Sequence, residues 1–342
     1  MVLALALAAV IWGGGALLSV PVRLRLIGLG LLYLAIVLSF FLLPDGAAVF
    51  GGSLYEWLFL GVLAILVLGY SRVLAALKCR ATPQKSAANT DGFSNTELDR
   101  NARHIVLRDI GGPGQKRLKA ARVLVIGAGG LGAPALQYLA AAGVGTVGVI
   151  DDDVVENSNL ARQVIHKDDA IGMPKVFSAQ AEMQAQNPHI TVRPYNRRLE
   201  ADMAGELFKD YDLVLDGCDN FDTRYLVNRT CVALKIPLIG AALSQWEGQI
   251  SSYHPASGGP CYACIFPNSP APGLAPSCAE GGVLGPLPGV VGAMMAVEAV
   301  KLIAGAGEGL VGRMLIYDAL YGENRALKMK RDPKCKVCAQ IG

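Results

Sequence analysis

Long apolar runs and short polar breaks alternate over the first seventy residues. Residues 2–20 and 26–43 contain no charged side chain, and a third apolar run over 55–71 contains only Glu56. A membrane-spanning helix needs roughly 17–25 mostly apolar residues. The first two runs therefore predict spanning helices, and the third is of marginal length. We expect about three transmembrane helices within residues 1–72.

The charges beside these runs predict an orientation. Basic residues lie between the first two runs and after the third, namely Arg23, Arg25, Arg72, Lys78 and Arg80. The acidic residues lie between the second run and the start of the third, where Asp45 follows the second run and Glu56 is at the beginning of the third. Basic loops stay in the cytoplasm. We therefore expect a multi-pass anchor in the bacterial plasma (inner) membrane, with the catalytic domain in the cytoplasm. A cleaved signal peptide is the alternative, but the first run lacks a basic start.

Residues 73–98 separate this anchor from the remainder of the chain and are expected to form a linker, because residues 79–96 are small and polar. Near its end, Ser94 and Glu97 have the spacing of a capping box, which predicts the start of a helix. Residues 99–342 then form the predicted catalytic domain.

A nucleotide-binding pattern begins shortly after this linker. The apolar segment 123–126 is followed by GAGGLG at 127–132, a helix that runs to residue 142, a second strand at 147–150 and then Asp151. Glycines of this kind let the backbone approach phosphates, and the acid binds ribose hydroxyls. Further strands are expected at 191–195, 213–215 and 237–239. The pattern predicts a doubly wound, Rossmann-like α/β domain with a mostly parallel sheet.

Such a glycine motif also occurs in NAD- and FAD-dependent oxidoreductases. Three residues favour a nucleoside triphosphate instead. Arg162 and Lys175 offer cations to a leaving pyrophosphate. Asp219 follows a predicted strand, at a place where a carboxylate can hold Mg²⁺ on phosphates.

Composition narrows the possible functions further. The 342-residue chain has a formal net charge of +3 and a hydrophobic share of 52%. A charge so near balance gives no reason to expect nucleic-acid binding. The four histidines, His104, His166, His189 and His254, fit no catalytic pattern and are interpreted as structural or surface residues.

The cysteines form two pairs with the C-x-x-C spacing, Cys261 with Cys264 and Cys335 with Cys338. Four thiolates match a closed, structural zinc site. A redox-active pair or buried free thiols are the alternatives. A zinc ion held by both pairs would tie the C-terminal end of the chain to the body of the domain.

The ordered blocks of this region resemble the MoeB/ThiF/HesA family, bacterial relatives of ubiquitin-activating enzymes. The resemblance runs from about residue 99 to residue 340. It rests on RNARH, GAGGLG, DDDVVENSNLARQ, GMPK, LDGCDN, GAALSQWEGQI, CYAC, CAEGGVLGPLPGVVG and CKVC.

The resemblance implies which residues bind ATP and Mg²⁺. It assigns phosphate contacts to the glycine loop and to Asn159, Arg162 and Lys175, the ribose to Asp151, and Mg²⁺ to Asp219. It also implies that Arg103 reaches into the ATP site of a second subunit, and hence a homodimer; Asn101 and His104 depart from the usual flanking residues. The complete nucleotide-binding set expected is Gly127, Gly129, Gly130, Gly132, Asp151, Asp153, Ser158, Asn159, Leu160, Arg162, Lys175, Asp219 and Asn220.

The reaction implied by the family is adenylylation of the C-terminal Gly-Gly carboxylate of a ubiquitin-like sulfur-carrier protein. The expected carrier is the small subunit of molybdopterin synthase, in molybdenum cofactor biosynthesis. Cys278 lies where some relatives carry a cysteine that links to the carrier. The chain contains no sulfurtransferase segment, so sulfur is expected to come from a separate donor protein.

Three alternatives remain at this stage. The same chemistry can act on the sulfur carrier of the thiamine pathway. An NAD-dependent oxidoreductase would bind NAD and catalyse no exchange between ATP and pyrophosphate. A non-catalytic scaffold would bind the carrier without activating it.

Overall fold

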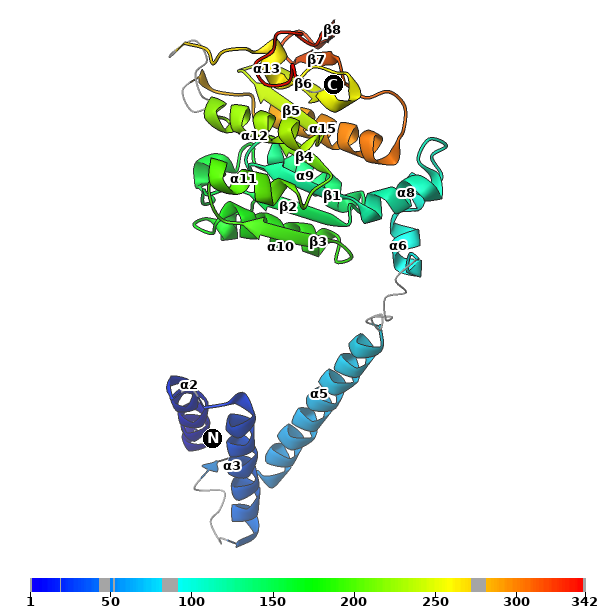
Figure 1. Ribbon diagram of the computed structural model, residues 1–342. Coiled ribbons are helices and arrows are strands. Elements are labelled where there is room, and N and C mark those ends of the chain that lie inside the picture. Colours follow the sequence, from blue (N-terminus) through cyan, green and yellow to red (C-terminus); the bar gives the residue numbers. More distant parts are fainter. Residues whose placement is uncertain are drawn as a thin grey trace. The chain divides into compact units, whose positions relative to one another are not determined.

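The chain folds into two compact units, Met1–Thr90 and Asp91–Gly342. The structure, a computed structural model, describes residues 2–18, 20–42, 50–51, 53–81, 92–271 and 281–340 (Figure 1). The first unit is helical, and the second contains every β-strand of the described residues.

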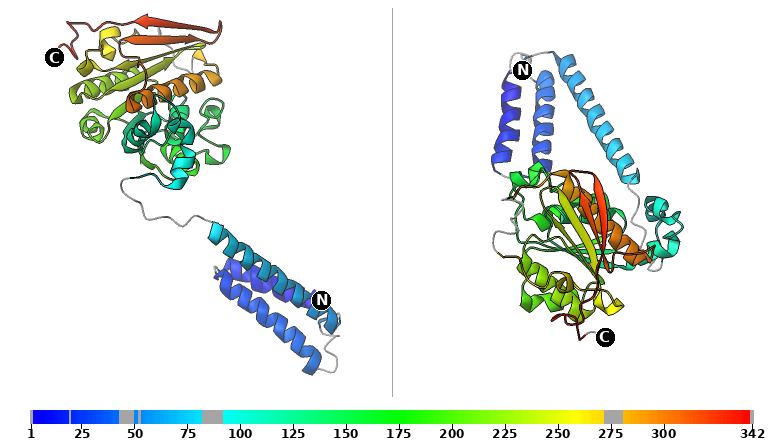
Figure 2. Two further views of the ribbon diagram at one scale, coloured as in Figure 1. Left: turned by 90° about the vertical axis from the view of Figure 1, so that its right-hand side faces the viewer. Right: turned by 90° about the horizontal axis from the view of Figure 1, so that it is seen from above.

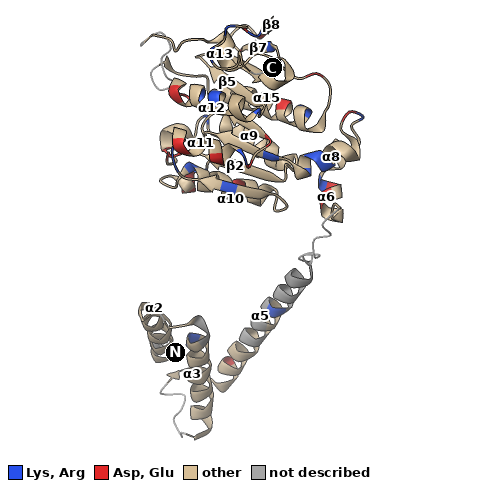
Figure 3. Cartoon of the chain, in the orientation of Figure 1, with Lys and Arg blue, Asp and Glu red and all other residues tan. Residues whose placement is uncertain are grey.

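The N-terminal unit consists of apolar helices. They are α1 (Val2–Ala9), a π-helical turn (Val10–Gly14), α2 (Gly15–Leu17), α3 (Val22–Leu42) and α5 (Leu54–Ala81). The Tyr33 hydroxyl of α3 donates a hydrogen bond to the Trp57 carbonyl of α5 at 2.8 Å. Gly61 lies against the same hydroxyl, so α3 and α5 approach closely there. Figure 3 shows how few charged residues these helices carry compared with the second unit.

The lengths of these helices differ from the predicted spans. Two described helices are long and apolar enough to cross a membrane, Leu24–Leu42 and Pro286–Ala304, and the second is half buried as a core helix of the α/β unit. Leu3–Gly14 and Leu54–Leu63 are shorter apolar helices. Of the three predicted spans, the second alone meets the length criterion among the described residues. Helix α5 also continues to Ala81, so the first part of the predicted linker is helical.

An eight-stranded sheet forms the centre of the second unit, in the order β3-β2-β1-β4-β5-β6-β7-β8. Strands β1 to β5 run parallel, and β5 to β8 pair antiparallel. The strands are β1 (Arg122–Ile126), β2 (Thr146–Ile150), β3 (Thr191–Tyr195), β4 (Leu213–Asp216), β5 (Leu238–Leu243), β6 (Glu247–Tyr253), β7 (Arg313–Asp318) and β8 (Glu323–Lys328). The prediction of a Rossmann-like, mostly parallel α/β fold is confirmed.

Helices cover both faces of this sheet (Figures 1 and 2). One face packs against α9 (Gly132–Ala141), α10 (Lys175–Gln186) and α15 (Pro286–Ala304), and the other against α11 (Ala201–Phe208) and α12 (Phe221–Leu234). Shorter helices are α6 (Asn95–Arg100), α7 (Ala102–Ile105), α8 (Gly111–Ala120), α13 (Tyr262–Ile265) and the 3₁₀ turns Asn157–Asn159, Asp168–Ala170 and Pro255–Ser257. Helix α6 begins with the predicted capping box of Ser94 and Glu97.

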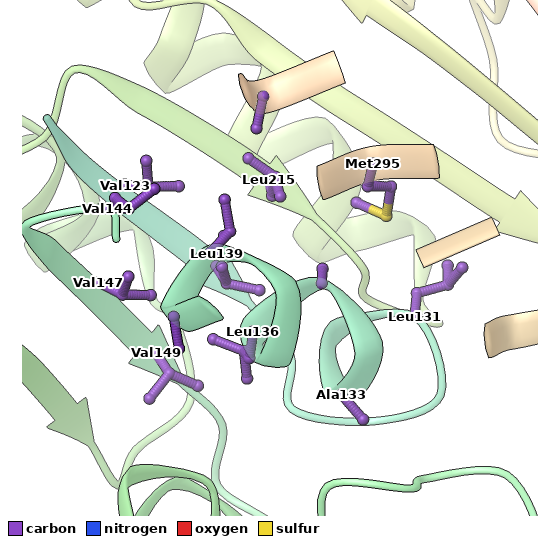
Figure 4. Close-up of a cluster of buried hydrophobic side chains, with 14 of the residues drawn as sticks. Val123, Leu131, Ala133, Leu136, Leu139, Val144, Val147, Val149, Leu215 and Met295 are labelled. Atoms are coloured by element: carbon purple, nitrogen blue, oxygen red, sulfur yellow. The ribbon is translucent and has the colours of Figure 1, made fainter. Parts of the chain in front are cut away.

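Successive side chains of β1 point to opposite faces of the sheet and contribute to a hydrophobic cluster on each face. Val123 and Val125 pack with Leu136 and Leu139 of α9, on the face seen in Figure 4. Leu124 belongs to the opposite cluster, beside α11 and α12. Both faces of a parallel strand are covered, so its side chains form a continuous apolar run, as in the sequence RVLVI.

The order of the strands determines where a ligand can bind. From β1 the chain crosses through α9 to β2, and from β4 it crosses through α12 to β5, on the opposite face and in the opposite direction. In a sheet of this order, the ligand crevice is expected between the carboxyl ends of β1 and β4.

Candidate active site

The glycine-rich loop 127–132 leaves β1 and turns directly into α9. Gly127 adopts a φ of +91°, a conformation that L side chains rarely adopt. A side chain on Gly132 would collide with the Gly127 carbonyl oxygen. The backbone N–H groups of this tight turn lie at the N-terminus of α9, where phosphate groups bind favourably.

Asp151 follows β2 directly and contacts this loop. Its Oδ2 accepts a hydrogen bond from the Ala128 N–H at 2.7 Å, and its Oδ1 accepts one from the Asp153 N–H at 2.9 Å. Burial raises the pKa of Asp151, and the two N–H donors oppose this shift. The acid predicted to bind ribose therefore lies beside the loop predicted to bind phosphates.

His166 contacts the same loop from the other side. Its Nε2 lies 2.9 Å from the Ala128 carbonyl oxygen, and its Nδ1 lies 2.9 Å from the Ser178 hydroxyl of α10. The ring is buried. Sequence reasoning interpreted this histidine as a structural or surface residue, and the structure shows that it is a buried neighbour of the glycine loop.

The turn around residues 156–162 is stabilised by its own polar groups. Asn159 is buried, and its Oδ1 accepts a hydrogen bond from the Glu156 N–H at 3.2 Å. The Arg162 guanidinium donates to the Ser158 carbonyl at 2.9 Å and stays partly exposed, and Leu160 is half-buried. Asn159 thus shapes the turn, while Arg162 keeps a surface that a ligand can contact.

Lys175 is the first residue of α10, and its side chain is 6% exposed. Its Nζ lies 2.6 Å from Oδ2 of Asp153, whose own side chain is 67% exposed. Asp153 in turn donates its N–H to Asp151. This chain of contacts links Lys175 to the acid that touches the glycine loop.

The segment after β4 forms the other wall of the crevice. Asp216 is buried, and its Oδ1 accepts a hydrogen bond from the Cys218 N–H at 3.0 Å. Arg224 of α12 donates to the Cys218 carbonyl at 2.7 Å and lies 3.9 Å from Asp216 Oδ2. Asp219 is exposed and makes no hydrogen bond or ion pair with the described residues. Asn220 caps α12 by accepting from the Thr223 N–H.

The two loops pack on each other through glycines. A Cβ on Gly127 would lie 3.3 Å from the Gly217 carbonyl oxygen, and a Cβ on Gly217 would lie 3.2 Å from the Gly132 nitrogen. Asp219, two residues after Gly217, is thereby held near the glycine loop. The structure brings together the glycine loop, Asp151, Asp153, Lys175 and the loop that carries Asp219.

Arg103, which is predicted to reach the ATP site of a second subunit, lies apart from this cluster. Arg103 is exposed on α7, and Asn101 beside that helix contacts Gly143, which precedes β2. That contact is at the amino ends of the strands, opposite the glycine loop. Cys278 lies outside the described residues, so its role stays a prediction.

The four predicted metal ligands converge on one point. The sulfurs of Cys261, Cys264, Cys335 and Cys338 lie within 4.8 Å of one another. Three of the S···S separations are 3.8, 3.6 and 3.4 Å, close to the separation of about 3.8 Å in a tetrahedral zinc site with Zn–S bonds of ~2.3 Å. All four are free thiols, three of them buried. The donor set fits zinc.

Sequence reasoning missed three residues that shape these loops, namely His166, Asp216 and Arg224. Each is less than a tenth exposed and pairs with a group distant in sequence or on another element. The positions of Asp216 and Arg224 in the sequence hold a weak signal, because an acid ends an apolar strand and a cation follows in the next helix.

The α/β unit is similar to known proteins. The sequence model described as the ThiF family matches residues 101–337. A protein called sulfur carrier protein adenylyltransferase, from Thermus thermophilus, is 50% identical over 250 residues, which are 72% of this chain and 92% of that protein. A protein called SAMP-activating enzyme E1, from Haloferax volcanii, is 49% identical over 247 residues, which are 72% of this chain and 91% of that protein.

Among solved structures, Escherichia coli MccB with ATP is similar to this chain. The TM-score is 0.61 at 24% identity, over 72% of this chain and 75% of that one. An identity this low shows a shared fold alone. The family match does not include the N-terminal unit.

Proposed function

Because the chain belongs to the ThiF family, we propose that it uses ATP to adenylylate the C-terminal carboxylate of a ubiquitin-like sulfur-carrier protein. The similarity to the Thermus and Haloferax enzymes carries this proposal, since it extends over more than nine tenths of each. The arrangement of Lys175 and Asp219 around the glycine loop supports it.

The reaction needs little from the protein beyond positioning and charge. A C-terminal carboxylate is already ionised at neutral pH, so no general base is required. One carboxylate oxygen attacks the α-phosphorus and forms a new O–P bond. The bond between the α-phosphorus and the bridging oxygen breaks, and pyrophosphate leaves with that electron pair. In-line positioning and neutralisation of the leaving group lower the barrier.

The residues of this chain divide these tasks. The N–H groups of the glycine loop hold phosphate oxygens, and Asp151 accepts hydrogen bonds from the ribose. Arg162 and Lys175 neutralise the charge that develops on pyrophosphate. Lys175 lies in an ion pair with Asp153, two residues after the acid that contacts the glycine loop.

Asp219 is the residue that would hold Mg²⁺. Its exposed carboxylate, which has no partner among the described residues, follows β4 on the loop that packs against the glycine loop through Gly217, and this suits a cation between protein and phosphates. When bound, the ion would neutralise phosphate charge.

Carrier-dependent exchange between ATP and pyrophosphate tests the proposed function. Wild-type chain should catalyse exchange with a Gly-Gly-ended carrier, and Lys175→Ala should lower the rate by about 100-fold, because a removed transition-state contact costs roughly that much. Lys167→Ala is the matched control, since its ion pair with Glu182 is exposed and contributes little. Failure of exchange with every carrier would exclude this function.

The carrier that we propose is the small subunit of molybdopterin synthase. The segment GAALSQWEGQI, which runs from within β5 into β6, supports this choice through its resemblance to that branch of the family. Comparison of kcat/KM for this carrier and for the thiamine-pathway carrier tests the assignment. A higher kcat/KM with the latter would reverse it.

We propose that the four-cysteine cluster holds one structural zinc ion, which ties the end of the chain to α13. Metal analysis should find about one zinc per chain, and Cys335→Ser with Cys338→Ser should remove it and lower the unfolding temperature. Cys231→Ser, at a buried thiol outside the cluster, should keep the metal. Full zinc content in the double variant would contradict the site.

We also propose that the N-terminal helices anchor the enzyme in a membrane, with three spans and the α/β unit in the cytoplasm. Exposed apolar side chains along α3 support this, among them Leu31, Leu34 and Phe41, each at least 62% exposed. Apolar surface of this extent is expected to contact lipid or protein.

Fractionation and a reporter fusion test this anchor. The full chain should stay in the membrane pellet after an alkaline wash, and a reporter fused after Ala81 should score as cytoplasmic. Release of the chain by the wash would exclude the anchor, and a periplasmic reporter would overturn the orientation.

A further inference from the structure

The Ala128 peptide groups are held from both sides. The Ala128 N–H donates to Asp151 Oδ2 at 2.7 Å, and its carbonyl oxygen lies 2.9 Å from His166 Nε2. Ala128 is completely buried. The Ala128 carbonyl lies in the same peptide plane as the N–H of Gly129, which is one of the groups proposed to hold the phosphates, so the orientation of this peptide sets the direction of that N–H.

The chemistry of the two partners fixes the roles of the ring nitrogens. A carbonyl oxygen only accepts, so Nε2 of His166 must carry a proton and donate to Ala128. Burial lowers the pKa of His166, although the Ala128 carbonyl opposes the shift, and the neutral ring is favoured. Its Nδ1 then accepts a hydrogen bond from the Ser178 hydroxyl.

The same residue connects the glycine loop to the segments that carry the cations. Ser178 lies three residues after Lys175, one turn along α10. The backbone N–H of His166 donates to the Gln163 carbonyl, and the Gln163 side chain lies 3.7 Å from the position of a Cβ on Gly129. Gln163 directly follows Arg162. The phosphate loop, the arginine turn and the lysine helix therefore share one buried histidine.

We propose that His166 is a positioning residue, which orients the glycine loop toward the phosphate chain of the nucleotide and holds it in register with Arg162 and Lys175. This inference rests on the proposed function, because it concerns how the same nucleotide is held. His166 touches neither the nucleotide nor the reacting atoms. It acts through the Ala128 carbonyl.

Two substitutions separate this role from simple packing. The amide of His166→Gln can place a donor where Nε2 lies, whereas the shorter amide of His166→Asn can reach Ser178 but not Ala128. The ligands are ATP and adenosine, which share a base and a ribose but differ in phosphates. Binding of each is measured directly on the full chain, together with thermal unfolding.

We expect His166→Asn to weaken ATP binding by about tenfold, because an unsatisfied buried carbonyl costs on the order of one hydrogen bond. His166→Gln should stay within about threefold of wild type, and adenosine binding should not change in either variant. In exchange assays, His166→Asn should raise the KM for ATP and leave that for the carrier unchanged. His189→Ala, at an exposed histidine near the amino ends of the strands, is the control.

Equal losses of ATP and adenosine affinity, or ATP affinity unchanged in His166→Asn, would overturn the inference. If both histidine variants fail to fold, Ser178→Ala tests the same network. It should weaken ATP binding by about threefold and spare adenosine, and loss of both would again contradict the proposal. Absence of exchange in the wild type would exclude the proposed function, while the contrast between ATP and adenosine would still decide the role of His166.

Discussion

The Asp151 carboxylate combines burial with a ligand-binding task, and this predicts a pH dependence. Its raised pKa means that it gains a proton at a higher pH than the usual value of about 3.9. A protonated carboxyl loses acceptor capacity toward ribose hydroxyls. ATP affinity should therefore decrease as the pH falls through this raised pKa. Titration of the ATP dissociation constant against pH should show this acid limb, and Asp151→Asn should remove it.

The stability of Asp151→Asn also depends on the direction of the Asp151 pKa shift. A carboxyl whose pKa is raised by folding stabilises the native state below its usual pKa and loses that contribution as the pH rises. At neutral pH, Asp151→Asn removes the buried charge but offers only one acceptor oxygen to the two N–H donors, so the two effects oppose each other and the unfolding temperature should change little. Asp152→Asn, at an exposed neighbour, should keep the acid limb. An unchanged acid limb in Asp151→Asn would assign the titration to another group.

At the residue scale, the sequence predicted those site residues that lie close together along the chain. Glycines at 127–132 and the acid after the second strand follow from one short motif. His166 did not follow, because its partner Ala128 is 38 residues away and only tertiary structure brings them together. A lone histidine in a polar turn carries no signal of such a contact.

Helix α12 is the element that stabilises the second loop of the crevice. Arg224 is buried against Asp216 and lies over the ring of Tyr262, which follows the first residue of the four-cysteine cluster. Asn228, one turn further along α12, accepts from the Tyr262 N–H and lies 3.8 Å from the Cys261 sulfur. One face of α12 thus joins the loop of Asp219 to the cysteine cluster.

Removing the Arg224 cation from this face of α12 should destabilise the fold. Arg224→Met leaves the Asp216 carboxylate buried and unpaired, so the free energy of unfolding should decrease by about 3–5 kcal/mol. Adding Asp216→Asn should restore part of that loss, because the uncompensated charge disappears. Denaturant unfolding measures both effects. Arg229→Met, at an exposed position of the same helix, should change stability little, and equal losses for both arginines would contradict the argument.

At the element scale, the central parallel strands were predictable and the antiparallel ones were not. Strands β1, β2 and β4 are apolar segments buried on both faces, which the sequence shows directly. Strand β8, ENRALK, is exposed along its whole length, and β6, EGQISSY, mixes polar and apolar residues. Their pairing depends on neighbours and register, which hydrophobic periodicity does not report.

At the scale of the whole molecule, the hydrophobic composition alone distinguishes two parts of the chain. Apolar helices that expose their side chains form one unit, and an α/β body with a buried core forms the other. The length of α5 does not follow from composition alone, because residues 73–81 continue the helix beyond the predicted span and into the predicted linker.

The position of Arg103 predicts that two chains share each active site. Its helix lies at the amino ends of the strands of its own chain, so we propose that Arg103 serves the ATP site of the partner in a homodimer. Mixed dimers of Arg103→Ala and Lys175→Ala chains then contain one intact site of two. Co-expressed with different tags and purified through both, they should recover about half of the wild-type exchange activity.

A second pair of mixed dimers is the matched control for this experiment. Arg162→Ala and Lys175→Ala remove two groups of the same site, so mixed dimers of that pair should recover nothing. If Arg103 acted within its own chain, its mixed dimers would stay as inactive as either parent, because each site would still lack one group. Recovery in the first pair and none in the second therefore requires that Arg103 cross between subunits, and sedimentation of the wild-type chain as a monomer would exclude it.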